Sequence, residues 1–244
     1  MGYTVEHLER SRANGFEPLN VFRATLAALL GLDGRPVRLL DCGCGTGFFT
    51  RQYARIGGVA ATGLDVDESL LAAAREIAAA EALSIDFVQG DILCLPYPDD
   101  AFDVVASDIL LEIFPDQQAP IGEMLRVCKP GGRILCMEPN YQSFVYFDPR
   151  LPQEENLRRI REENAAHAFG AGVELPDAMF RLGVEQMQLV PWFWGGCAIS
   201  AGGALQRAAA VLSGIDVYLV CGRKPDGQSK RGACAASLHR RAPG

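Results

Sequence analysis

Apolar residues along this chain fall into two alternating patterns. Short runs rich in Val, Leu and Ile, each followed by polar or glycine-rich residues, are typical of buried strands. Between them lie longer stretches in which apolar residues recur on one face of a helix. Together the two patterns predict strands at 37–42, 59–65, 85–89, 102–107 and 133–138 and helices at 46–56, 68–82 and 116–128. Such alternation indicates an α/β protein.

The pattern differs on both sides of this alternating region. The elements predicted there are helices at 5–13, 18–32 and 154–167, a helix ending near Leu182, and strands at 184–190 and 215–221. We expect one domain over 1–223, with residues 1–34 as a helical cap. Segments 140–172 and 191–213 are expected to be lids over a substrate. The polar, basic residues 224–244 are expected to form a disordered tail.

The residues after the first predicted strand form the most distinctive motif. That strand ends at Asp41, and glycines follow at every second position, Gly43, Gly45 and Gly47, before a helix begins. Glycine adopts unusual dihedrals and has no Cβ, so a ligand can lie against such a turn. A dinucleotide-binding turn would place its third glycine where this chain has Phe48. The turn therefore argues against a nucleotide-dependent oxidoreductase.

Acidic residues stand at the ends of the next three predicted strands, at Asp65, Asp91 and Asp108. Asp91 or Asp108 alone would more often be a helix cap or turn residue. All three, however, lie on the edge where open α/β sheets bind ligands. With the glycine turn and the Lys129-Pro-Gly-Gly132 break before the fifth strand, they make the chain resemble class I S-adenosylmethionine-dependent methyltransferases. The resemblance is to the branch that contains ubiquinone-biosynthesis-type and small-molecule methyltransferases.

The resemblance implies a Rossmann-like, doubly wound α/β fold. Its sheet would be mostly parallel with an antiparallel last strand, an N-terminal helical cap and a lid insertion after the fifth strand. It also implies S-adenosylmethionine as the cofactor and S-adenosylhomocysteine as the product. Asp65 would accept hydrogen bonds from the ribose and Asp91 from the adenine amino group, and Asp108 would either reach the methionine amino group or close its pocket. The expected cofactor-binding residues are Tyr3, Asp41, Gly43, Gly45, Thr46, Asp65, Val66, Asp91, Ile92 and Asp108.

Methyl transfer asks for in-line alignment of the acceptor atom, the methyl carbon and the sulfur, and proximity and orientation supply most of the acceleration. A general base is needed only if the acceptor must lose a proton. Glu112, which follows the fourth strand, is a candidate base. It could equally hold the methionine end of the cofactor or simply stand beside a helix cap. Tyr141 is a second candidate, and no metal is expected.

Aromatic residues gather in the two expected lid segments. The first contains Tyr141 and Phe144, and the second contains Trp192-Phe-Trp194, which holds both tryptophans of the chain. An aromatic, weakly polar wall suits an apolar or aromatic small molecule as the acceptor. The alternative is that these rings form the core beneath a lid.

Composition restricts the partners. The net charge is −7, and the tail from Lys224 holds five Lys or Arg against one Asp, so no nucleic-acid partner is expected. No apolar run is long enough to span a bilayer, and the charged start is unlike a signal peptide, so no membrane partner is expected. Eight cysteines without a Cys-x-x-Cys pair indicate free thiols of a cytoplasmic protein. A monomer or homodimer is expected.

Two other functions stay open. RNA or protein methylation is the first, although Asp108 is followed by Ile109-Leu110 and not by the Pro-Pro-aromatic sequence typical of amino-group methylation. The second is a non-catalytic regulator that binds S-adenosylmethionine but has a filled acceptor pocket.

Overall fold

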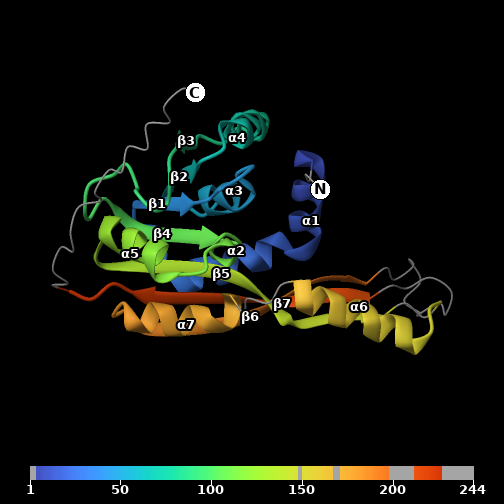
Figure 1. Cartoon of the computed structure of the whole chain (residues 1–244). Helices are drawn as coiled ribbons and strands as arrows, with labels where there is room; N and C mark the ends of the chain where they lie inside the picture. The colour runs from blue at the N-terminus through green and yellow to red at the C-terminus, as the bar shows by residue number, and fades with distance from the viewer. Residues whose placement is uncertain (1–3, 148–149, 167–170, 198–211, 227–244) are drawn as a thin grey trace, which may run out of the picture.

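The computed structural model describes residues 4–147, 150–166, 171–197 and 212–226. Within them, seven strands form one sheet in the order β3-β2-β1-β4-β5-β7-β6 (Figure 1). The strands are β1 (Val37–Cys42), β2 (Val59–Asp65), β3 (Asp86–Gln89), β4 (Phe102–Asp108), β5 (Cys128–Phe147), β6 (Glu185–Cys197) and β7 (Leu212–Arg223). Only β7 runs antiparallel to its neighbours, β5 and β6. The expected mostly parallel sheet with an antiparallel last strand is confirmed.

Helices pack on both faces of this sheet (Figure 1). They are α1 (Val5–Gly15), α2 (Leu19–Leu30), α3 (Phe48–Ala54), α4 (Glu68–Ala80), the 3₁₀ turn η1 (Leu111–Ile113), α5 (Gln118–Val127), α6 (Gln153–Ala166) and α7 (Ala171–Arg181). Successive side chains of a strand point to opposite faces. Leu39 therefore joins the core formed with α2 and α3, whereas Leu40 joins the core formed with α5 and α7. This two-sided burial explains why the central strands are continuous apolar runs.

The two segments expected to be lids are partly strands. β5 continues to Phe147 in pairing with the start of β7, and β6 continues to Cys197 along the same strand. The three strands project beyond the rest of the molecule, with α6 alongside β5 (Figure 1). Residues 140–147 and 191–197 are strands because both segments pair with β7. Residues 198–211 of the second segment lie outside the described residues.

An aromatic cluster attaches the N-terminal helices to the sheet. Phe16, in the turn between α1 and α2, lies 4.7 Å from Phe22 and 5.1 Å from Phe49 between ring centroids. Trp192 of β6 lies 5.3 Å from Phe22, and its indole N–H donates to the Gly15 carbonyl at 3.3 Å. Trp192 was expected in the acceptor wall. Its half-buried ring packs at the base of the helical cap, and its contact with an acceptor stays a prediction.

The described residues continue past the expected domain boundary at residue 223. Lys224 is 5% exposed, and its ammonium donates to the Cys128 carbonyl at 2.7 Å and to Asp100 at 2.9 Å. Its backbone also exchanges hydrogen bonds with Gly131 and Gly132. Lys224 is therefore part of the folded domain. Residues 227–244 of the expected tail lie outside the described part of the chain. None of the helices in that part is long and apolar enough to cross a membrane.

Candidate active site

The turn after β1 follows a backbone path that only glycine adopts readily. Gly43, Gly45 and Gly47 have φ angles of +74°, +54° and +75°. A Cβ on Gly43 would lie 2.4 Å from Leu110, and one on Gly47 would lie 2.8 Å from Phe87, so both also permit close packing. No atom lies within 4 Å of the Cβ position at Gly45. The turn therefore presents bare backbone to open space at Gly45.

The carboxylate of Asp65, at the end of β2, is tied to this turn. Its Oδ2 accepts a hydrogen bond from the N–H of Gly45 at 2.8 Å, and its Oδ1 accepts one from the N–H of Asp67 at 3.0 Å. Asp65 is half-buried, and Val66 beside it is 62% exposed. Each carboxylate oxygen has a second lone pair, so Asp65 can still accept from the hydroxyls of a ligand.

Two further carboxylates are buried where β1 and β4 end. Asp41 is 1% exposed and accepts a hydrogen bond from the Thr50 hydroxyl, and Asp108 is 3% exposed and accepts one from the Tyr53 hydroxyl at 2.8 Å. The Oδ1 atom of each is buried without a protein partner. Burial raises the pKa of Asp41 to about 7. Burial, and then the charge of Asp41, raises the pKa of Asp108 well above its usual value. Asp41 and Asp108, called the acidic pair below, can therefore bind a cation through their unpartnered oxygens.

Arg12, on α1, brings a positive charge to the acidic pair. Its Nη1 is buried without a protein partner, and its guanidinium lies 5.9 Å from the centre of the Phe49 ring. Burial lowers the pKa of Arg12, whereas the charges of Glu9, Asp41 and Asp108 raise it. A guanidinium with one unpartnered nitrogen, near two unpartnered carboxylate oxygens, can bind a zwitterion.

Glu9, one turn earlier on α1, fixes the helix over the glycine turn. Its carboxylate accepts hydrogen bonds from the Thr46 hydroxyl and from Arg51 of α3. Arg51 in turn donates to the Thr46 carbonyl at 2.9 Å, and Thr46 and Arg51 are both almost fully buried. α1 stands at the end of the molecule where α3 begins (Figure 1). This contact places Arg12 at the acidic pair.

A buried carboxylate on β5 shapes the segment after β4. Glu138, fully buried, accepts hydrogen bonds from the N–H groups of Leu110 at 3.0 Å, Leu111 at 2.7 Å and Glu112 at 3.2 Å. Burial raises the pKa of Glu138 to about 8, although these bonds lower it. Ile109 just before them has a φ of +56°, which is strained for a β-branched residue. Glu138 therefore holds a strained turn and fixes the backbone that carries Glu112.

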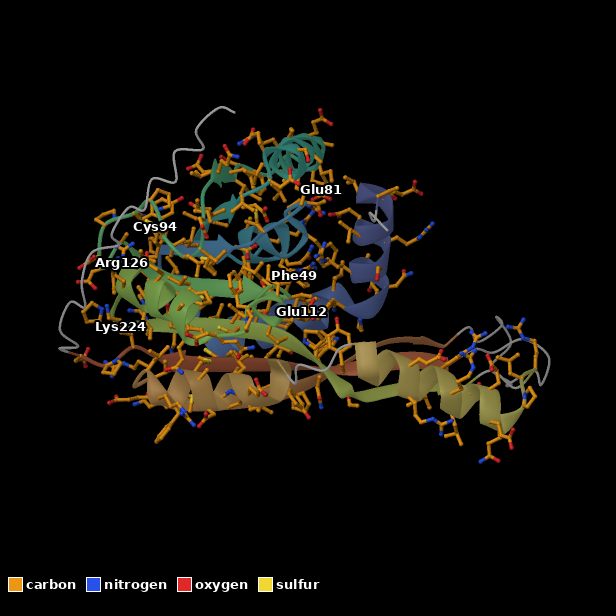
Figure 2. The ribbon with its side chains drawn as sticks, in the orientation of Figure 1. Phe49, Glu81, Cys94, Glu112, Arg126 and Lys224 are labelled. Atoms are coloured by element: carbon orange, nitrogen blue, oxygen red, sulfur yellow. The ribbon has the colours of Figure 1, made fainter. Side chains whose placement is uncertain are left out.

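Glu112 itself is half-buried, and its Oε2 is buried without a protein partner. Figure 2 shows Glu112 and Phe49 at the same end of the sheet, on the side of α1. Within the described residues, the unpartnered atoms of Arg12, Asp41, Asp108 and Glu112 thus gather at the carboxyl ends of the strands. Guanidinium and carboxylate groups fit a ligand that carries an ammonium and a carboxylate, as the methionine part of S-adenosylmethionine does.

Known proteins share this sequence and fold. Residues 40–136 match the family model described as a methyltransferase domain. The demethylmenaquinone methyltransferase of Shouchella clausii is 32% identical over 180 residues, which cover 67% of this chain and 77% of that protein. This chain belongs to the class I S-adenosylmethionine-dependent methyltransferases. S-adenosylmethionine is its cofactor, and the expected family, fold and activity are confirmed.

Solved structures share the fold of this methyltransferase. A Bacillus halodurans protein assigned as a methyltransferase superposes with a TM-score of 0.61 at 18% identity, covering 83% of this chain and 98% of that one. Phosphoethanolamine N-methyltransferase 2 of Haemonchus contortus, solved in complex with S-adenosylmethionine, gives a TM-score of 0.57 at 15% identity. That match covers 84% of this chain and 53% of the other.

The remaining residues expected at the site of this methyltransferase range from exposed to buried. Asp91 is exposed, and its Oδ1 accepts a hydrogen bond from the Leu93 N–H at 2.9 Å. Ile92 was expected at the adenine surface, but it is 5% exposed and packs in the core, whereas Leu93 is 43% exposed. Tyr141 is half-buried in β5, and Tyr3 lies outside the described residues.

Sequence reasoning missed two residues of the candidate site, Glu9 and Glu138, and only Glu138 left a signal in the sequence. A single glutamate in the apolar run that forms the fifth strand is the signal that was available. A charged group is rarely buried unless its hydrogen bonds are satisfied, so its position predicts donors nearby. The pattern does not say which segment donates them.

Proposed function

We propose that this methyltransferase binds S-adenosylmethionine along the carboxyl edge of β1, β2 and β4. The observation that carries the proposal is the buried pair of carboxylates with Arg12 beside it. Asp41 and Asp108 bind the methionine ammonium, and Arg12 binds the methionine carboxylate. Glu9 and Thr46 keep α1 closed over the bound cofactor, which excludes water from the reaction.

The rest of the cofactor follows the edge toward β3. The nucleoside passes Gly45, where the backbone borders open space, and its ribose hydroxyls donate to Asp65. Val66 and Leu93, both exposed, flank the adenine ring, and Asp91 accepts from its amino group. Burial of these two apolar side chains would contribute to affinity in proportion to the area removed from water.

The acceptor is an apolar or aromatic small molecule that enters beside η1. Ile113, 66% exposed, and the half-buried Phe114 provide an apolar surface next to Glu112. The Shouchella clausii relative is named for demethylmenaquinone, an apolar ring compound, and this agrees with that surface. S-adenosylmethionine supplies a methyl group on a sulfonium, and the protein aligns the acceptor and keeps the site dry. Glu112 accepts the proton that a hydroxylated acceptor loses.

The experiment measures S-adenosylhomocysteine release from the purified protein with a panel of hydroxylated quinones, phenols and aliphatic alcohols. We expect turnover with the aromatic compounds and little with the aliphatic ones. In Glu112→Gln, kcat should fall by about 10² to 10⁴ with S-adenosylhomocysteine affinity unchanged, as for loss of a general base. Loss of that affinity instead would place Glu112 at the methionine end of the cofactor. Tight cofactor binding with no turnover of any small molecule would favour the non-catalytic regulator.

The same proposal includes a cytoplasmic location. Among the described residues Cys42, Cys44, Cys128, Cys136 and Cys221 are buried and free, which is usual where thiols are kept reduced. Cell fractionation of the tagged protein tests this location.

A further inference from the structure

A cavity lies next to the glycine turn but apart from the acidic pair. Its volume is about 400 Å³, and it is formed by α1, α2, α3 and the end of α4. Neither Asp41 nor Asp108 lines it. Its charged lining is Arg10, Arg23, Arg51, Arg55, Glu9 and Glu81. We propose that this cavity binds a small organic polyanion that carries phosphate or carboxylate groups, and that its occupancy weakens cofactor binding.

The cavity has an excess of positive charge in a chain whose net charge is −7. Its two carboxylates are already taken by two of the arginines. Arg51 pairs with Glu9 and, at 2.9 Å, with Glu81, and Arg55 pairs with Glu81 at 2.8 Å. Figure 2 shows Glu81 on the side of α4 that faces α1. The remaining two guanidinium groups therefore carry the positive excess.

Those two groups, on Arg10 and Arg23, have weak partners. Arg10 reaches Glu6 only at 3.9 Å, with both side chains mostly exposed, and such pairs contribute little. Arg23 donates to the neutral Gln52 amide oxygen at 3.0 Å. Guanidinium groups bind phosphate and carboxylate through two parallel hydrogen bonds, so both arginines are suited to an anion.

The cavity also has an apolar wall, made by Ala13, Leu19 and Phe48. Its volume is within the range of small-molecule sites in proteins. A lining that combines guanidinium groups with apolar side chains suits an organic anion better than a bare inorganic ion. The charged part alone should still bind, which allows a simple probe.

Occupancy acts on the cofactor site through Glu9 and Arg51. Both line the cavity, and both contact Thr46 of the glycine turn. A bound anion competes with Glu9 for Arg51 and repels the Glu9 carboxylate, because the two carry the same charge. α1 is then held less firmly over the turn. This effect rests on the proposed cofactor site, and by linkage the cofactor weakens anion binding by the same factor.

The first test titrates pyrophosphate into the full chain by calorimetry at constant ionic strength. We expect one saturable site, with affinity lowered about tenfold or more, or about 1.4 kcal/mol, in each of Arg10→Gln and Arg23→Gln. Arg181→Gln is the matched control, since Arg181 is an exposed arginine on α7, paired with Asp177 and remote from the cavity. No saturable binding, or equal binding by Arg23→Gln and the unaltered chain, would overturn the site. This titration does not depend on the proposed function.

The second test titrates S-adenosylhomocysteine at increasing pyrophosphate. Its affinity should fall several-fold and reach a plateau, and Glu9→Gln, which removes the repelled charge, should bind pyrophosphate more tightly and lose the antagonism. A fall without a plateau would mean that the two ligands share one site and would refute a separate anion site in the cavity. A protein that binds pyrophosphate but never S-adenosylhomocysteine would refute the cofactor site and the coupling while leaving the anion site in place.

Discussion

The affinity for S-adenosylhomocysteine should rise with pH between 6 and 8. Burial raises the pKa of Asp41 to about 7, so its carboxyl in the free protein is partly protonated in this range. The pKa of Asp108 is raised as well. A ligand ammonium beside these groups favours their ionised forms, so binding releases protons. Where a ligand releases protons, its affinity increases as the pH rises.

The magnitude follows from the single titration of Asp41. With a pKa of about 7, the carboxyl is about 90% protonated at pH 6 and about 10% protonated at pH 8. If the ligand binds only the ionised form, its affinity rises about tenfold over these two pH units, or about 1.4 kcal/mol. Release of a further proton from Asp108 would make the rise steeper.

Calorimetry in two buffers of different ionisation enthalpy measures both the affinity and the number of protons released. The control is Asp41→Asn, which can still accept the Thr50 hydroxyl hydrogen bond but does not titrate. It should bind more weakly at pH 8 and show a flatter pH profile. The variant also shows whether the pH dependence arises from Asp41 or from Glu138, because the pKa of Glu138, about 8, lies in the same range. A wild-type affinity that is constant from pH 6 to 8, with no proton release, would refute the reasoning.

Three further results are expected. Asp65→Ala should weaken S-adenosylhomocysteine binding by about 1.5–3 kcal/mol, as for hydrogen bonds to a charged group; unchanged affinity by calorimetry would remove Asp65 from the site. Trp192→Ala should lower the free energy of unfolding by about 3 kcal/mol and reduce ligand-induced stabilisation, whereas intact stabilisation in thermal melts would separate Trp192 from the cap. The melting temperature of the free protein should fall as the pH rises from 5 to 8. The raised pKa values of Asp41 and Glu138 mean that the folded state binds more protons there than the unfolded state; a rising melting temperature would contradict them.

The alternating pattern predicted the central sheet well, because each strand is buried on both faces and its apolar run has a clear beginning and end. It failed where strands leave the core. Residues 140–147 and 191–197 carry polar, proline and aromatic residues that resemble a loop, and only their pairing with β7 makes them strands. Long-range pairing of this kind leaves no periodic signal in a single sequence.

The sequence predicted those features of the candidate site that the path of the backbone determines. Glycines at every second position specify the turn, and acids at strand ends specify the edge, so both were found from spacing. The sequence did not predict which way individual side chains point. Trp192 packs beneath the cap and Ile92 in the core, although each stands beside a residue that faces outward, because one step along a chain changes the face.

Charge balance links the N-terminal helices to the proposed cofactor site. Asp41 and Asp108 cannot both ionise in a buried site without a cation, and within the described residues α1 supplies one through Arg12. When a zwitterionic ligand adds its ammonium to the acids, Arg12 is left to bind the ligand carboxylate. Opening α1 would then separate two charge pairs at once, and Glu9 would also lose Thr46. In the proposed site, the same contacts would therefore stabilise both the closed cap and the bound cofactor, and we expect α1 to move before the product is released.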